Sequence, residues 1–229
     1  MKIEIWSDVM CPFCYIGKKH FEQALTQIPY QDKIQVEWKS FQLNPDLSKT
    51  EITSVNDYLI ESKGISEEQV SAMNNQLAEM GKAVGIDFQQ QNSKVVNTGD
   101  AHRLIHFAQA NGKGSEAEER LFKAYFTEGK NVADYDVLAE LAEEIGLNKT
   151  EVLEMLNSDA NVFEVASDIL DARNIGVSGV PFFVIDRKYA LSGAQPVEYF
   201  VSALTQAYEK DHLDQPQNVA SCDVDGNCD

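Results

Sequence analysis

Near the N-terminus of this chain of 229 residues, the spacing of apolar residues changes from that of a strand to that of a helix and back again. Residues 2–6 alternate apolar and polar side chains, which predicts a β-strand. A helical spacing begins at Pro12 and stops near Pro29, and residues 34–38 then alternate again as a second strand. The N-terminal part is therefore expected to fold as β-α-β.

The middle of the chain, from about residue 53 to residue 174, has a helical pattern. Ser66 with Gln69, and Ser115 with Glu118, have the spacing of capping boxes at helix N-termini. Five glycines stand where helix C-caps are expected: Gly81, Gly112, Gly129, Gly146 and Gly176. These helix start and stop signals predict about six or seven helices.

After the helical stretch the pattern returns to strands. Residues 180–185 are apolar and β-rich, residues 189–191 form the expected partner strand, and a last helix starts near Pro196. Each β-containing end is too small to form a stable domain alone, so we expect one sheet with a helical block inserted between its halves.

This α/β organisation divides the chain into three parts. Residues 1–52 and 175–212 are expected to form one discontinuous domain, and residues 53–174 an inserted all-α domain. Residues 213–229 are polar and are expected to form a flexible C-terminal tail.

The formal net charge of −18 restricts the partners of the chain. Such a surface repels the phosphates of nucleic acids and anionic lipid, so neither nucleic acid nor a membrane is an expected partner. The N-terminus has no long apolar signal segment, and no stretch approaches the roughly 20 apolar residues that cross a bilayer. We therefore expect a cytoplasmic protein. The sequence leaves its oligomeric state open.

The four cysteines fall into two close pairs, of which Cys11 and Cys14 form the more informative one. A Cys-x-x-Cys spacing alone is weak evidence, because zinc sites share it. Here it follows a predicted strand and opens a predicted helix, with Pro12 at the first helical position. The helix dipole and free backbone N–H groups favour a thiolate at this position. We predict that Cys11 is a redox nucleophile and Cys14 the resolving thiol.

Val180-Pro181 is the second supporting feature. A proline before an apolar strand removes a ladder hydrogen bond, and a cis peptide bond would explain its presence. A cis bond also presents the preceding amide and carbonyl to an extended substrate. We predict that this bond is cis and lies against the sulfur of Cys11. An ordinary edge-strand or turn proline is the alternative.

Four segments of the chain together resemble a known family: IEIWSDVMCPFCYIGKKHFEQAL, NTGDAHRLIHFA, GVSGVPFFVID and SGAQPVEYF. They look like the FrnE-like subgroup of the DsbA family of oxidoreductases. The resemblance implies a thioredoxin fold with an inserted helical domain, a redox-active Cys11–Cys14 pair and a cis-proline at Pro181. Phe13 departs from the subgroup, which commonly has tryptophan there, and this difference is expected to tune the redox potential.

The remaining candidate residues lie outside these motifs. Cys222 and Cys228 resemble a second, auxiliary redox pair of some family members; two exposed thiols without a role are the alternative. His102 and His106 are spaced i, i+4, but without a third ligand we expect no metal site. We expect Asn97, His102 and Arg103 to shape the helix that faces the redox motif, either for substrate or for packing.

The leading hypothesis is a thiol–disulfide oxidoreductase, with isomerase activity as an extension, acting on thiols or disulfides of proteins or small molecules. It needs no cofactor besides its cysteines, and glutathione is a candidate redox partner. A related glutathione-binding enzyme, of the kappa-class transferase or 2-hydroxychromene-2-carboxylate isomerase kind, is the second hypothesis. Those enzymes typically have serine where Cys11 stands. A zinc protein with four cysteine ligands and a redox-inactive peptide-binding module are the non-enzymatic alternatives.

Overall fold

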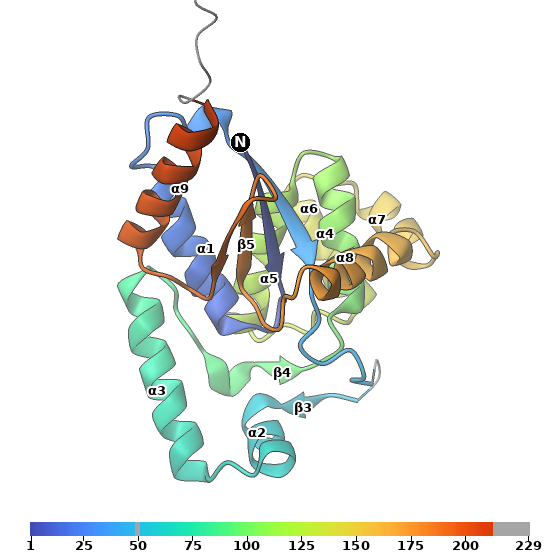
Figure 1. Ribbon diagram of the computed structural model, residues 1–229. Helices are drawn as coiled ribbons and strands as arrows, with labels where there is room; N and C mark the ends of the chain where they lie inside the picture. Colours follow the sequence, from blue (N-terminus) through green and yellow to red (C-terminus); the bar gives the residue numbers. More distant parts are fainter. Residues whose placement is uncertain (49–50, 213–229) are drawn as a thin grey trace, which may run out of the picture.

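The computed structural model of the protein describes residues 1–48 and 51–212 (Figure 1). Cys222 and Cys228, and with them the predicted C-terminal tail, lie outside the described residues.

The two ends of the chain form a single four-stranded sheet, as the sequence predicted. The strand order is β2-β1-β5-β6, with β1 parallel to β2 and antiparallel to β5. The strands are β1 (Lys2–Ser7), β2 (Gln35–Ser40), β5 (Phe182–Ile185) and β6 (Tyr189–Ser192). Helix α1 (Pro12–Leu25) connects the two parallel strands, and α9 (Val197–His212) follows the β5–β6 hairpin. This arrangement is the thioredoxin fold that the resemblance implied.

Seven helices of the described chain lie between β2 and β5, in agreement with the helical insertion. They are α2 (Val55–Lys63), α3 (Glu67–Ala83), α4 (Gly99–Ala110), α5 (Gly114–Phe126), α6 (Tyr135–Glu144), α7 (Lys149–Leu156) and α8 (Val162–Asn174). A short ribbon of β3 (Thr53–Ser54) and β4 (Lys94–Val95) holds the α2–α3 pair, which lies below the end of the sheet at the start of α1 (Figure 1). The domain limits expected from the sequence stay a prediction.

Alternation along the central strands fixes which helices cover each face of the sheet. Phe183 of β5 packs against Phe21 of α1 and Phe200 of α9, with ring centroids 5.6 and 4.7 Å away. Trp6 points to the opposite face, where it is fully buried and its indole N–H donates to the Asp168 carbonyl of α8. Because successive side chains of a strand point to opposite faces, helices cover both sides of the sheet.

Two of the expected helix-end signals are wrong. The Ser66–Gln69 capping box is present. The predicted Ser115–Glu118 box is absent because Glu118 is buried and accepts a hydrogen bond from the hydroxyl of Ser7 instead. Helix α3 runs through Gly81, whose place as a C-cap is therefore wrong.

Candidate active site

Cys11 lies at the junction between β1 and α1. It is the N-cap residue of α1, Pro12 is the first helical residue, and the Cys14 amide donates to the Cys11 carbonyl over 3.0 Å. Both cysteines are free thiols, and their residues are only 4% and 1% exposed. The arrangement places the Cys11 residue at the N-terminus of α1, beside the free backbone N–H groups of the first helical turn.

Val180 and Pro181 meet this motif from the other end of the chain. Their peptide bond is cis, as predicted, and the thiol of Cys11 lies 3.6 Å from the Val180 carbonyl oxygen. The ring of Pro181 also lies against Gly17 in α1, where a Cβ would come within 3.0 Å of Pro181 Cγ. Gly17 was not identified from the sequence, although a glycine inside an amphipathic helix is itself a signal of close approach.

The surroundings of Cys14 disfavour its ionised form. Burial raises the pKa of the Cys14 thiol well above its usual 9.0, and interactions with Cys11 raise this pKa further. A backbone hydrogen bond at Asp8 and the side chain of Ser7 oppose these effects. Cys14 is therefore held in its protonated form, as expected of a thiol that reacts second.

A buried polar cluster continues from Cys14 into the inserted helices. The hydroxyl of Ser7 donates to Glu118 Oε1 over 2.5 Å, and burial raises the pKa of the Glu118 carboxyl. His102 Nε2 lies 3.4 Å from Asp8 Oδ1, and the other oxygen of Asp8 accepts from the Leu43 amide at 2.7 Å. His102 thus contacts Asp8, and the backbone carbonyl of Asp8 accepts a hydrogen bond from the Cys11 amide over 2.9 Å. Sequence reasoning missed Ser7 and Glu118.

A cavity of about 400 Å³ opens beside the cysteine motif. Pro12 and Phe13 form one wall, and α2 and α3 form the opposite one. Phe13 is 48% exposed, so the residue that departs from the related subgroup faces this space.

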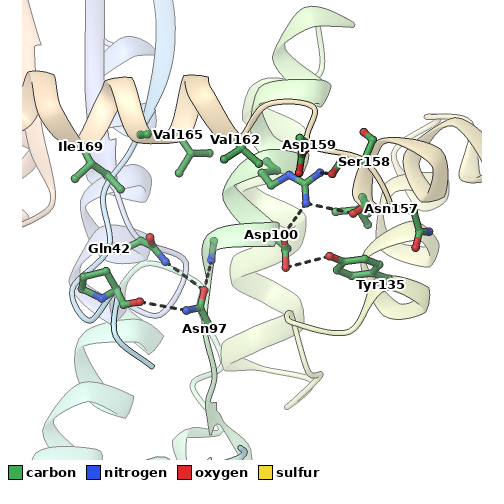
Figure 2. A pocket seen from close by; sticks show the side chains of 15 residues that line it. Gln42, Asn97, Asp100, Tyr135, Asn157, Ser158, Asp159, Val162, Val165 and Ile169 are labelled. Carbon is green, nitrogen blue, oxygen red and sulfur yellow. Dashed lines mark hydrogen bonds and ion pairs between the residues drawn. The ribbon is translucent and has the colours of Figure 1, made fainter. Parts of the chain in front are cut away.

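A second cavity, of about 660 Å³, lies near the start of α4 and contains no residue of the cysteine motif (Figure 2). The amide of Asn97 bridges the carbonyls of Pro45 and Leu47 and accepts from Gln42, as the dashed lines in Figure 2 show in part. Arg103 donates to four carbonyls at the α7–α8 connection. Both side chains hold loops in place, and both also line this cavity.

The two helical histidines do not converge on one point. His106 Nε2 lies 2.9 Å from Asp168 Oδ2, whereas His102 faces Asp8. Within the described ranges, no group of three His, Cys, Asp or Glu side chains is placed to hold a metal ion. A zinc site that uses Cys222 and Cys228 lies outside these ranges. No helix in the described part of the chain has the length and apolar character needed to span a membrane.

A strand–helix–strand unit joined to a β-hairpin, with a Cys-x-x-Cys motif facing a Val–Pro step, defines the thioredoxin-like class of protein. The chain belongs to the DSBA-like thioredoxin domain family, whose model matches residues 2–205.

Individual relatives agree with this assignment. The chain is 29% identical over 210 residues to the uncharacterized protein YwbO of Bacillus subtilis, covering 91% of this chain and 98% of that protein. A probable DsbA oxidoreductase from Streptomyces coelicolor is 37% identical, with a TM-score of 0.89 and coverage of 100% and 98%. The cytosolic disulfide reductase DsbM from Pseudomonas aeruginosa shares the fold, with 18% identity, a TM-score of 0.64 and coverage of 90% and 98%.

Proposed function

We propose that this protein is a dithiol–disulfide oxidoreductase in which Cys11 is the nucleophile and Cys14 the resolving thiol. One observation carries the proposal: the Cys11 sulfur lies at the N-terminus of α1 and 3.6 Å from the Val180 carbonyl, while Cys14 is buried one turn deeper. Burial disfavours the thiolate of Cys14, so we assign the first attack to Cys11 and the second to Cys14.

The reaction proceeds by two thiol–disulfide exchanges. The Cys11 thiolate attacks a disulfide R–S–S–R′, forms a Cys11–S–S–R mixed disulfide and releases R′–S⁻. Cys14 then loses its proton and attacks the Cys11 sulfur, which releases R–S⁻. In total the substrate disulfide gains two electrons and becomes two thiols, and the Cys11–Cys14 dithiol becomes a disulfide. A low-molecular-weight thiol or a dithiol returns the enzyme to its reduced form.

Several other residues are assigned roles around these two sulfurs. Pro12 starts the helix, Phe13 faces the cavity, and the backbone of Val180 and Pro181 lies where an extended substrate would pass. His102 acts through Asp8 as a positioning residue. The proposal includes isomerase activity, which arises when a second substrate thiol resolves the mixed disulfide before Cys14 does.

The proposal includes a cytoplasmic location and glutathione as the reductant. A solved structure of DsbM, described as a cytosolic disulfide reductase, contains GSH. Two glutathione thiols supply the two electrons that reduce the Cys11–Cys14 disulfide, and one glutathione disulfide leaves. Cys222 and Cys228 are proposed as an auxiliary dithiol that can exchange with the first pair.

The decisive experiment compares three variants in a disulfide-reduction assay with glutathione. We expect Cys11→Ser to abolish turnover, and Cys14→Ser to accumulate a mixed disulfide that mass spectrometry detects on Cys11. The double variant Cys222→Ser/Cys228→Ser reports separately on the tail pair. Full activity of Cys11→Ser would reject the proposed function.

A further inference from the structure

The cavity beside the cysteine motif is built from residues that flank the reactive sulfur. Met10 and Pro12, on either side of Cys11 in the chain, both line it. The opposite wall comes from α2 and α3, which supply Leu59 and Met73 among other side chains. The insertion therefore brings a second wall to the residues on either side of Cys11, so a group bound in the cavity would lie close to the cysteine motif.

The chemistry of this cavity differs from that of the protein surface. Among the described residues that line it, none is Asp, Glu, Lys, Arg or His. Most of its lining is apolar, and the methionines come from the segment before α1 and from α3. The polar lining groups include the neutral amides of Asn74 and Gln90. The lining offers no cation to an anionic group, the nearby Lys63 Nζ lying 5.7 Å from the centre of the Tyr58 ring, and burying an unpaired carboxylate is strongly unfavourable. Methionine side chains adapt to apolar groups of varied shape.

The size of the cavity restricts the occupant further. About 400 Å³ lies within the range of small-molecule sites. The residue Cys11 is 4% exposed, enclosed by α1 on one side and by the Val180 backbone on the other. A folded protein disulfide would have to reach a recessed sulfur, whereas a small disulfide can enter the cavity.

We propose that this cavity binds the neutral aromatic or aliphatic half of a low-molecular-weight disulfide, the sulfur of which is attacked by Cys11. The inference rests on the proposed function and adds the substrate class. Cys11 attacks the sulfur of the apolar half, and the other half leaves as its thiolate. Cys14 then attacks the Cys11 sulfur and the apolar half leaves as its thiolate, so the two electrons come from the Cys11–Cys14 dithiol. The two carboxylates of glutathione are not accommodated in this cavity, so glutathione reacts there only through its sulfur from outside.

The test uses three disulfides that share one 2-hydroxyethylthio half. The other half is benzylthio, 4-carboxybenzylthio or a second 2-hydroxyethylthio group. The measurement is the second-order rate constant for oxidation of the full-length reduced protein, followed by acid quench, alkylation and mass spectrometry. Each rate constant is divided by that of free 2-mercaptoethanol with the same disulfide, which removes differences in intrinsic reactivity. We expect the benzyl disulfide to react about tenfold faster than the bis(2-hydroxyethyl) disulfide, and the carboxybenzyl disulfide to lose that advantage.

A pair of matched variants locates the effect. Met73→Glu puts a charge on the cavity wall at a residue that is 47% exposed, and Leu170→Glu makes an equivalent change on α8 at a residue that is 57% exposed. We expect Met73→Glu to bring the ratio of benzyl to bis(2-hydroxyethyl) rate constants close to one, and Leu170→Glu to leave this ratio as in the wild type.

The outcomes separate the two proposals. A ratio near one in the wild type, or a ratio that Met73→Glu does not change, would overturn the cavity assignment while the oxidoreductase function stands. The small-molecule assignment would also be overturned if the protein preferred a disulfide of a phenylalanine-containing cysteine peptide, lost that preference in Met73→Glu, and showed no such preference for the benzyl disulfide. If no disulfide oxidises Cys11, the proposed function itself fails.

Discussion

Gly17 and Pro181 are in direct contact, although 163 positions separate them in the chain: a Cβ at position 17 would lie 3.0 Å from Pro181 Cγ and 3.4 Å from Ala194 Cα. Helix α1 can therefore approach the loop before β5 only because residue 17 has no side chain. Since Cys14 lies one turn before Gly17, this contact sets the separation between the cysteine motif and Val180-Pro181.

The contact predicts the effect of Gly17→Ala. Replacing glycine by alanine inside a helix stabilises it by about 1 kcal/mol, whereas overpacking costs about 1–3 kcal/mol. We expect a net loss of about 1 kcal/mol in the free energy of unfolding, measured by urea denaturation, and an altered rate of Cys11 alkylation. The control is Gly179→Ala, because a Cβ there meets nothing within 4 Å. A Gly17→Ala variant more stable than the wild type would contradict the prediction.

The protonated state of Cys14 predicts a pH-dependent second step. Because burial holds the pKa of this thiol well above 9.0, its thiolate fraction rises about tenfold per pH unit below that value. We expect the mixed disulfide on Cys11 to resolve about ten times faster for each unit of pH increase, measured by rapid acid quench and mass spectrometry. A resolution rate that is flat between about pH 6 and pH 8 would show that Cys14 is already ionised.

Glu118 predicts how stability depends on pH. Burial raises the pKa of this carboxyl above its usual 4.5, so the folded protein retains a proton that the unfolded chain releases. This contribution to stability is complete below pH 4.5 and is lost as the pH rises through the folded-state pKa. Glutamine does not ionise, so Glu118→Gln does not lose stability in this way. The difference in unfolding free energy, variant minus wild type, should therefore be larger at about pH 8 than at about pH 4.

The exposed Glu116 on the same helix is the matched control for that measurement. Its pKa is lowered, first by a backbone hydrogen bond at its own residue, so its stabilising contribution is present above pH 4.5 and lost on acidification. Glu116→Gln should therefore show no relative gain at high pH. Parallel pH profiles for the two glutamine variants would refute the assignment of Glu118 as a buried, proton-retaining group.

Replacing Arg103 is expected to affect the stability of the fold. Its guanidinium donates to the carbonyls of Met155, Ser158 and Ala160 at 2.6, 2.5 and 2.8 Å and pairs with Asp100 at 2.7 Å. We expect Arg103→Met to lower the free energy of unfolding by about 3–5 kcal/mol, because buried acceptors and a buried carboxylate lose their partner. Arg173→Met, at an exposed position of α8, should change it by less than about 0.5 kcal/mol. Equal losses in both variants would contradict the assignment.

The sequence predicted those parts of the molecule that local physics specifies. Alternation identified the strands, and the Pro12 position and the Val180-Pro181 step indicated where the two ends of the chain meet. Each of these features depends only on residues that are close together in the chain, so it can be recognised in a single sequence. The α/β organisation and the expected Cys11–Val180 proximity followed from these local signals, whereas the thioredoxin fold was what the family resemblance implied.

Other parts of the site depend on contacts that local patterns do not encode. Ser115 and Glu118 have the spacing of a capping box, but the buried hydroxyl of Ser7 offers Glu118 a partner more than 100 positions away. Gly81 resembles a C-cap, yet α3 continues to Ala83, and residue 81 is a glycine because Phe88 packs where its side chain would be. Tertiary contacts override local preference in both cases.

The order of strands in the sheet has a consequence for the synthesis of the chain. Strand β1 lies between β2 and β5, but the ribosome makes β5 only after the seven helices of the insertion. During most of translation the nascent chain therefore carries Cys11 and Cys14 beside an unpaired strand edge and without the Val180 segment that encloses them. Such edges and thiols invite wrong pairing. The segment that encloses the two thiols is therefore among the last parts of the described chain to be made.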